Sequence, residues 1–182
     1  GTLGIWESFR PLVWPFILGL AWELNLNVFL VGKILDLSLS LLVIYLTYKV
    51  AQLLFIKDSE VSLKISLLSA LILSATPLFI LFTGLILTEP LAMVFGLLGI
   101  YLFTLVFIKE TNIFFRLFFS GLFLSLSFLT KFPQGIWFGG CFLLLIFQKK
   151  EVIPKLKNII SFSIGFLLLV LPYLWLNYHL YG

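Results

Sequence analysis

The sequence predicts an all-α, polytopic membrane protein, and three observations carry this prediction. The 182 residues are 62% hydrophobic and only 11% charged, whereas a soluble domain has roughly 45–50% apolar and about 25% charged residues. Apolar runs of about 20 residues, the length that crosses a bilayer as one helix, recur along the chain. Short polar loops separate these runs and carry most of the lysines, as loops between membrane helices do.

An N-terminal segment precedes the long apolar runs. We expect residues 1–27 to form an outer loop and a juxtamembrane or re-entrant helix, because the apolar stretch from Pro11 to Trp22 is short for a span. Trp6 and Trp14, like Trp22, suit the aromatic belt at a membrane interface.

About six transmembrane helices follow, within a single transmembrane domain that covers residues 1–182. Pro77 is expected to kink the second of them, and Pro172 interrupts the last. The fourth and fifth apolar runs are the shortest. We predict spans at residues 28–56, 65–87, 90–108, 114–131, 133–148 and 158–178.

The distribution of lysine and arginine predicts the orientation. If the helices alternate in direction, the loops at 57–64, 109–116 and 149–157 share one side and hold eight basic residues, against three on the other side. Basic loops are typically cytoplasmic. We therefore expect the opposite face, with Arg10, Lys33 and Lys131, to lie outside or in a lumen, in a plasma, inner or endoplasmic reticulum membrane.

Charges of both signs gather at this predicted outer face, as in a membrane-embedded site that opens outward. Glu89 lies in the turn before the third span, where it can cap that helix or bind a sugar hydroxyl, a metal or a neighbouring cation. Lys131 can snorkel to the interface or bind a lipid phosphate. Arg10 has a planar guanidinium that suits phosphate, and it can also anchor to lipid headgroups.

The other polar residues have plainer interpretations. Lys33 and Asp36 are three residues apart on one helix, so they can form an ion pair. Glu7 and Glu23 are interpreted as solvated loop acids, and the isolated His179 is a poor metal-ligand set. The sequence shows no phosphate-binding glycine loop and no nucleophile triad. Its basic residues sit at helix ends, which argues against a nucleic-acid partner.

A series of short patterns occurs in order along nearly the whole chain. They are FRPLVWP at 9–15, the basic residue Lys33, ATPLF at 75–79, LTEPL at 87–91, a spaced set of Gly121, Leu126, Leu129, Thr130 and Lys131, and a final set of Gly165, Leu171, Pro172, Asn177 and Gly182. The ordered series resembles the GT-C superfamily of membrane glycosyltransferases. The likeness is greatest to the dolichyl-phosphate-mannose protein mannosyltransferases and the aminoarabinose transferases of lipid A.

The resemblance implies a transferase that takes a sugar from a polyprenyl-phosphate-linked donor and passes it to an acceptor protein, lipid or glycan at the outer or luminal face of the bilayer. It implies that Arg10, Lys131 and Lys33 bind the donor or its phosphate, and that Glu89 and Glu7 contact sugar or metal in a cavity. The only cofactor considered is a divalent metal, and the resemblance does not decide whether one is bound.

The catalytic residue is expected outside this chain. In the family that the patterns resemble, the catalytic aspartate lies in a loop that would precede Gly1. The resemblance therefore assigns no catalytic residue here, and it implies a fragment of a larger enzyme that is inactive alone.

Two other functions stay open at this point. Kinked helices and charges within apolar segments also occur in transporters and channels. The charges here cluster at one face, however, and no inverted repeat is visible. A non-enzymatic membrane scaffold is the third hypothesis.

Overall fold

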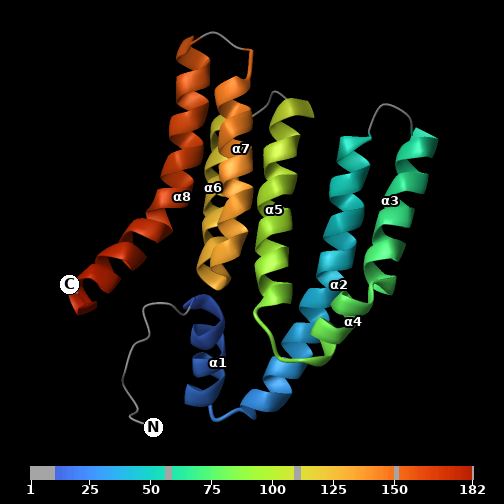
Figure 1. Cartoon of the computed structure of the whole chain (residues 1–182), viewed down its shortest axis with the longest axis vertical. Coiled ribbons are helices and arrows are strands. Elements are labelled where there is room, and N and C mark those ends of the chain that lie inside the picture. The colour runs from blue at the N-terminus through green and yellow to red at the C-terminus, as the bar shows by residue number, and fades with distance from the viewer. Residues whose placement is uncertain (1–10, 56–58, 109–111, 150–151, 182) are drawn as a thin grey trace.

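The computed structural model describes residues 11–55, 59–108, 112–149 and 152–181. Within these ranges the regular structure is entirely helical (Figure 1), which confirms the all-α fold class. The helices in chain order are α1 (Val13–Glu23), α2 (Val28–Leu54), α3 (Ser59–Ala75), α4 (Pro77–Gly84), α5 (Glu89–Ile108), α6 (Ile113–Thr130), the 3₁₀ helix η1 (Phe132–Gln134), α7 (Gly135–Phe147) and α8 (Val152–Tyr181).

The number of spans is smaller than predicted. Among the described residues, α2, α5, α6 and α8 are long and apolar enough to cross a membrane, and α3 with α4 makes a fifth span if the bent pair is counted as one. The fifth predicted span, at residues 133–148, falls on α7, whose 13 residues rise only about 20 Å, less than the roughly 30 Å of a hydrocarbon core. The chain is nevertheless an integral, multi-pass membrane protein.

The break between α3 and α4 is a bend of 60°, and Pro77 causes it. Proline lacks the backbone N–H of a helix interior, and it drives the residue before it out of the helical region. Thr76 accordingly has the extended angles φ −69° and ψ 120°, and Pro77 begins α4. The Thr76 hydroxyl donates to the carbonyl oxygen of Ile72 at 2.8 Å, which satisfies one carbonyl at the end of α3.

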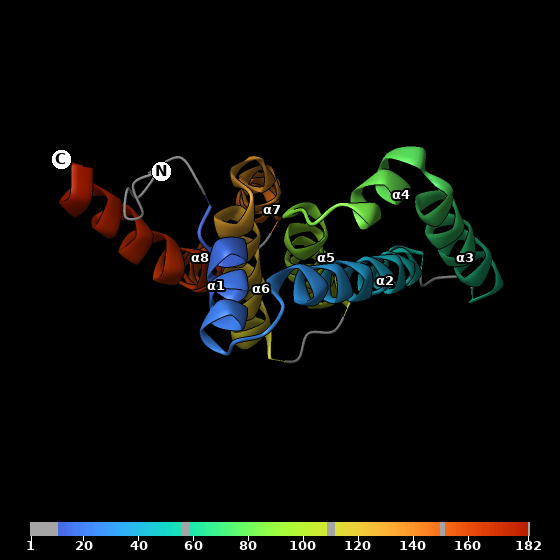
Figure 2. The same ribbon diagram turned by 90° about the horizontal axis from the view of Figure 1, so that it is seen from below.

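The helices form a bundle with two distinct ends. The helix termini that flank the loops after α2, α5 and α7 lie together at the upper end in Figure 1. The helix α1, the start of α2, the linker between α4 and α5, and the end of α6 lie toward the opposite end. We call these the loop end and the α1 end. Seen from below, α5 and α6 lie centrally, with α3 and α4 at one edge and α8 at the other (Figure 2).

Helices α6 and α8 approach each other at two glycines. A Cβ atom added at Gly121 would lie 2.1 Å from the carbonyl oxygen of Phe162, and one added at Gly165 would lie 2.0 Å from that of Phe118. Small residues allow membrane helices to pack with their backbones in contact. The Ser161 hydroxyl also donates to the Phe114 carbonyl oxygen at 2.6 Å, so a hydrogen bond joins the same two helices.

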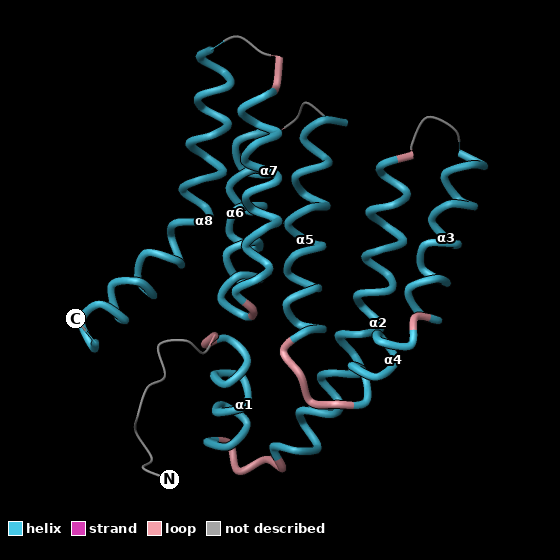
Figure 3. Tube along the Cα trace, viewed as in Figure 1, coloured by secondary structure: helices cyan, strands magenta, loops and turns pink. Residues whose placement is uncertain are grey.

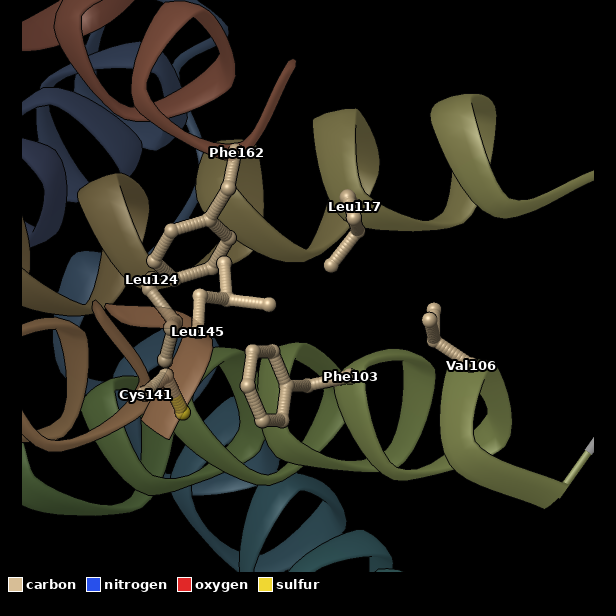
Figure 4. Close-up of a cluster of buried hydrophobic side chains, with 7 residues drawn as sticks. All are labelled: Phe103, Val106, Leu117, Leu124, Cys141, Leu145 and Phe162. Atoms are coloured by element: carbon tan, nitrogen blue, oxygen red, sulfur yellow. The ribbon is translucent and has the colours of Figure 1, made fainter. Parts of the chain in front are cut away.

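Helices α5 and α6 are joined by two buried hydroxyl groups. Ser120 Oγ donates to the carbonyl oxygen of Gly99, and Ser127 Oγ donates to that of Ala92, each at 2.8 Å. The hydrophobic cluster beside them is drawn in Figure 4 and consists of Phe103, Val106, Leu117, Leu124, Cys141, Leu145 and Phe162. These contacts set the register in which the start of α5 meets the end of α6.

The contact between α6 and α8 makes a prediction about stability. Gly121→Ala should lower the free energy of unfolding by about 1–3 kcal/mol, because the added methyl group forces two backbones apart. The matched control is Gly139→Ala, since nothing lies within 4 Å of a Cβ there; it should leave stability unchanged or raise it by up to about 1 kcal/mol. Thermal unfolding of both variants in detergent measures the difference. Equal melting temperatures would contradict the close approach.

Candidate functional site

An ion pair joins two helices at the α1 end of the bundle. The Nζ atom of Lys131 lies 2.6 Å from Oε1 of Glu89. The Thr88 hydroxyl donates to the other carboxylate oxygen, Oε2, at 3.3 Å. The Glu89 side chain is 19% exposed and that of Lys131 is 34% exposed. The pair is therefore partly buried, and Lys131 is the more exposed of its two side chains.

Each charge of this pair stands at the helix end that favours its sign. Glu89 is the first residue of α5, where the helix dipole is positive, and Lys131 follows the last residue of α6, where it is negative. The Lys131 backbone N–H donates to the Ser127 carbonyl oxygen at 2.9 Å. Since the Ser127 hydroxyl bonds to Ala92 of α5, the register of α5 and α6 brings the two charges together.

Lys33 has partners other than the one predicted for it. Its Nζ atom donates to the carbonyl oxygen of Gly84 at 3.3 Å and lies 5.3 Å from the centroid of the Phe29 ring. The predicted ion pair between Lys33 and Asp36 is therefore wrong. The reason is that Asp36 points into the protein, whereas Lys33 is exposed.

In the first half of α2 the buried face follows a spacing of four residues. Gly32, Asp36 and Ser40 lie on it, and residues at this spacing share one side of a helix. The extended linker between α4 and α5 (Figure 3) covers this face, since a Cβ atom added at Gly32 would lie 3.0 Å from the Ile86 side chain. Lys33 lies one residue off this stripe, which explains its exposure.

Asp36 is the polar residue that the sequence did not single out as part of the site. Its side chain is 1% exposed, and neither of its carboxylate oxygens has a hydrogen-bond partner among the described residues. The Ser40 hydroxyl one turn later is also unpartnered. The Leu87 backbone lies nearby without full hydrogen-bond geometry, and the charges of Glu89 and Lys33 act on Asp36 as well. The spacing of four residues between Gly32, Asp36 and Ser40 was the sequence signal that could have placed Asp36 on the buried side of this helix.

The remaining candidates divide into two groups. Arg10 and Glu7 lie outside the described residues. Glu23 is exposed at the end of α1, and His179 stacks on Trp175 with 5.6 Å between ring centroids. Across the described ranges, no three His, Cys, Asp or Glu side chains come close enough to hold a metal ion together.

The arrangement at the α1 end suits an anionic ligand more than a cation. The Lys131 ammonium group has three donors, and Glu89 Oε1 engages it on one side. The remaining donors can bind a phosphate or carboxylate oxygen. Glu89, whose second oxygen is held by Thr88, fixes the position of the ammonium group. Charge-assisted hydrogen bonds of this kind are about twice as strong as neutral ones.

Comparison with known proteins identifies one family. Residues 16–181, nearly the whole chain, match the family model described as dolichyl-phosphate-mannose-protein mannosyltransferase. The matched part includes both partners of the ion pair. No curated protein and no solved structure matches the chain.

The unpartnered carboxyl group of Asp36 makes a prediction that is independent of function. Asp36→Asn should raise the melting temperature at pH 7 by a few degrees, because a buried charge without a partner costs more than a neutral amide of the same shape. Glu23→Gln is the control at an exposed acid and should have no effect. Differential scanning fluorimetry compares the two. A melting temperature lowered by Asp36→Asn would show that the carboxylate has a stabilising partner.

Proposed function

The chain belongs to the dolichyl-phosphate-mannose-protein mannosyltransferase family, and on this premise we propose that it serves the transfer of a sugar from a polyprenyl-phosphate donor to an acceptor. Family membership makes it a membrane glycosyltransferase of the GT-C type. The narrower likeness to the aminoarabinose transferases, and the choice of a protein, lipid or glycan as acceptor, belong to the proposal.

The observation that carries the proposal is the pair of Lys131 and Glu89 at the α1 end. A polyprenyl phosphate has one compact anionic head, and an ammonium group binds such a head as a point charge. The 34% exposure of the Lys131 side chain leaves room for that contact. We assign Lys131 the role of binding the donor phosphate, and Glu89 the role of positioning Lys131 and contacting the sugar hydroxyls.

Lys131 also fits the chemistry of the leaving group. In the proposed inverting displacement, the bond between the sugar C1 and the phosphate oxygen breaks, and a bond between C1 and the acceptor oxygen forms. A carboxylate takes the acceptor proton, and polyprenyl phosphate leaves with the bonding electron pair. A cation beside the phosphate stabilises the charge that develops there. We assign the proton-accepting role to no residue of this chain.

Further contacts to the donor are assigned to the same face. Lys33 is exposed and held by one long hydrogen bond to Gly84, so it can turn toward a phosphate. Arg10 is a further proposed phosphate ligand, and Glu7 a proposed cavity residue. A divalent metal beside Glu89 remains a hypothesis that would need ligands beyond the described residues.

The proposed orientation places this site outside the cell or in a lumen. The helix ends that flank the basic loops lie together at the loop end of the bundle (Figure 1). Positively charged loops favour the cytoplasmic side. The ion pair at the opposite end therefore faces outward.

Substitutions at Lys131 test the proposal in the complete protein. Lys131→Ala should lower the rate of sugar transfer from a polyprenyl-phosphate donor about 100-fold, the scale of losing one charge-stabilising contact. Lys131→Arg should retain more of the rate because it keeps the charge. Lys64→Ala is the control, since Lys64 is an exposed lysine paired with Glu60 on α3. A rate for Lys131→Ala equal to that of the control would overturn the assignment.

A further inference from the structure

Two buried polar side chains of α2 have no part in the proposed sugar transfer. Asp36 is 1% exposed and Ser40 is 2% exposed. Both carboxylate oxygens of Asp36 and the hydroxyl oxygen of Ser40 have no hydrogen-bond partner among the described residues. A buried carboxylate without a partner is costly, and buried charges in proteins are paired or coordinate metal ions. The two side chains therefore point to a ligand that neutralises the charge.

The spacing of these residues brings their oxygen atoms to the same side of α2. Residues four apart on a helix are neighbours, with about 5–6 Å between their Cβ atoms. Asp36 and Ser40 can therefore contact one small ion together, the carboxylate from one turn and the hydroxyl from the next. Lys33 does not occupy this position, because its ammonium group donates to the Gly84 carbonyl oxygen and lies over the Phe29 ring.

The linker between α4 and α5 passes over this side of α2 (Figure 3). Its residue Ile86 packs against Gly32, where an added Cβ atom would lie 3.0 Å from the Ile86 side chain. The Leu87 backbone lies near the Asp36 carboxylate. Non-helical backbone at broken membrane helices offers carbonyl oxygens that coordinate sodium in transporters. The linker can supply such oxygens to an ion at Asp36.

Ser40 also borders a cavity of about 170 Å³ at the break between α3 and α4. Ser74 of α3 and Thr83 of α4 line the same cavity. Their hydroxyls donate to carbonyl oxygens of their own helices, Ser74 to Leu71 at 2.8 Å and Thr83 to Ile80 at 2.7 Å. A hydroxyl oxygen that donates still has lone pairs for a cation or a water molecule. The Ser40 hydroxyl therefore adjoins a space large enough for a water ligand of an ion.

These oxygen ligands indicate a monovalent cation. Carboxylate, hydroxyl and carbonyl oxygens suit hard cations rather than soft ones. Calcium sites combine several carboxylates, and magnesium is commonly held together with substrate phosphates. Across the described ranges no three His, Cys, Asp or Glu side chains lie close enough to bind a metal ion together. Glu89, whose charge also acts on Asp36, is engaged by Lys131. One positive charge is enough to neutralise the Asp36 carboxylate.

We propose that Asp36 and Ser40 bind a sodium ion beneath the linker between α4 and α5. The Asp36 carboxylate supplies the charge, the Ser40 hydroxyl supplies a neutral ligand, and backbone carbonyl oxygens of the linker complete the coordination. The close packing of Ile86 on Gly32 favours a small ion, which is why sodium is assigned rather than potassium.

The bound ion ties the linker to α2. The linker continues directly into Thr88 and Glu89, which hold Lys131, so the ion also steadies the ion pair. The inference itself does not depend on the proposed function, because it concerns the binding of an ion and not the transfer of a sugar.

Two serines of α2 provide a matched pair of substitutions. Ser40 is buried beside Asp36, whereas Ser38 is exposed and lies about 200° away around the helix. Ser40→Ala removes a hydroxyl that has no hydrogen bond to lose among the described residues, and Ser38→Ala changes an exposed position. Asp36→Asn keeps the shape of the side chain and removes its charge. All three variants should therefore fold.

The first test measures binding of ²²Na⁺ to the purified, complete protein in detergent, with choline as the other cation. The wild-type protein should bind one ion per chain in a saturable manner. Ser40→Ala should weaken binding about tenfold or more, the scale of losing one polar contact to a charged group. Asp36→Asn should abolish binding, and Ser38→Ala should leave it unchanged. Unlabelled potassium should compete more weakly than unlabelled sodium.

The second test measures the melting temperature in sodium against choline at equal ionic strength. Sodium should raise the melting temperature of the wild-type protein by a few degrees, because a ligand that binds only the folded state stabilises it. Asp36→Asn should not respond to sodium. The higher melting temperature predicted above for Asp36→Asn then applies to the sodium-free buffer, and saturating sodium narrows or reverses the difference.

Other outcomes overturn the inference. Sodium binding by Asp36→Asn as strong as that of the wild-type protein would place the ion elsewhere, and equal effects of Ser40→Ala and Ser38→Ala would remove Ser40 from the site. No saturable binding and no response of the melting temperature would show that a proton neutralises Asp36. Potassium or magnesium competing as well as sodium would overturn the assignment of a small monovalent ion. None of these results bears on Lys131, whose role is tested by the rate of sugar transfer.

Discussion

The close packing of α6 between α5 and α8 is the constraint on which the rest of the structure depends. In a bilayer, lipid tails are as apolar as leucine, so helices associate through van der Waals contact and hydrogen bonds rather than through the hydrophobic effect. Gly121 and Gly165 let two backbones touch, and Ser120 and Ser127 bond across to α5. This packing allows one register, and that register determines which residues meet at the α1 end.

The ion pair of Glu89 and Lys131 follows from that register. Forming it costs part of the hydration of both charges. Two charges in a partly buried position lose hydration, and their mutual attraction offsets this loss only when the geometry is good. Glu89 and Lys131 meet at 2.6 Å, each at the helix end that favours its sign. Asp36 adds a buried acid whose carboxylate oxygens have no hydrogen-bond partner among the described residues. Polar groups of this kind inside a membrane protein mark functional sites more often than structural ones, and their concentration at one end agrees with family membership.

Much of the fold class could be predicted from composition, because apolar runs of bilayer length have few alternatives. The number of spans could not be read from hydropathy, since α7 is apolar yet too short and Pro77 breaks one run into two helices. Glu89 and Lys131 were predicted as site residues because the sequence places both at the same face of the membrane. Their direct contact was not, because 42 residues separate them and only the α5–α6 register joins them. Asp36 was paired with Lys33 from their spacing of three, whereas the buried residues Gly32, Asp36 and Ser40 follow a spacing of four.

The role proposed for the Lys131 ammonium group is to bind the phosphate of the lipid donor. The most direct measurement is a solid-state NMR recoupling experiment between ³¹P of bound polyprenyl phosphate and ¹⁵N in lysine side chains. We expect a short-range coupling that disappears in Lys131→Gln and persists in Lys64→Gln. A coupling that survives in Lys131→Gln, or bound lipid without any coupling to a lysine, would contradict the proposed role of Lys131.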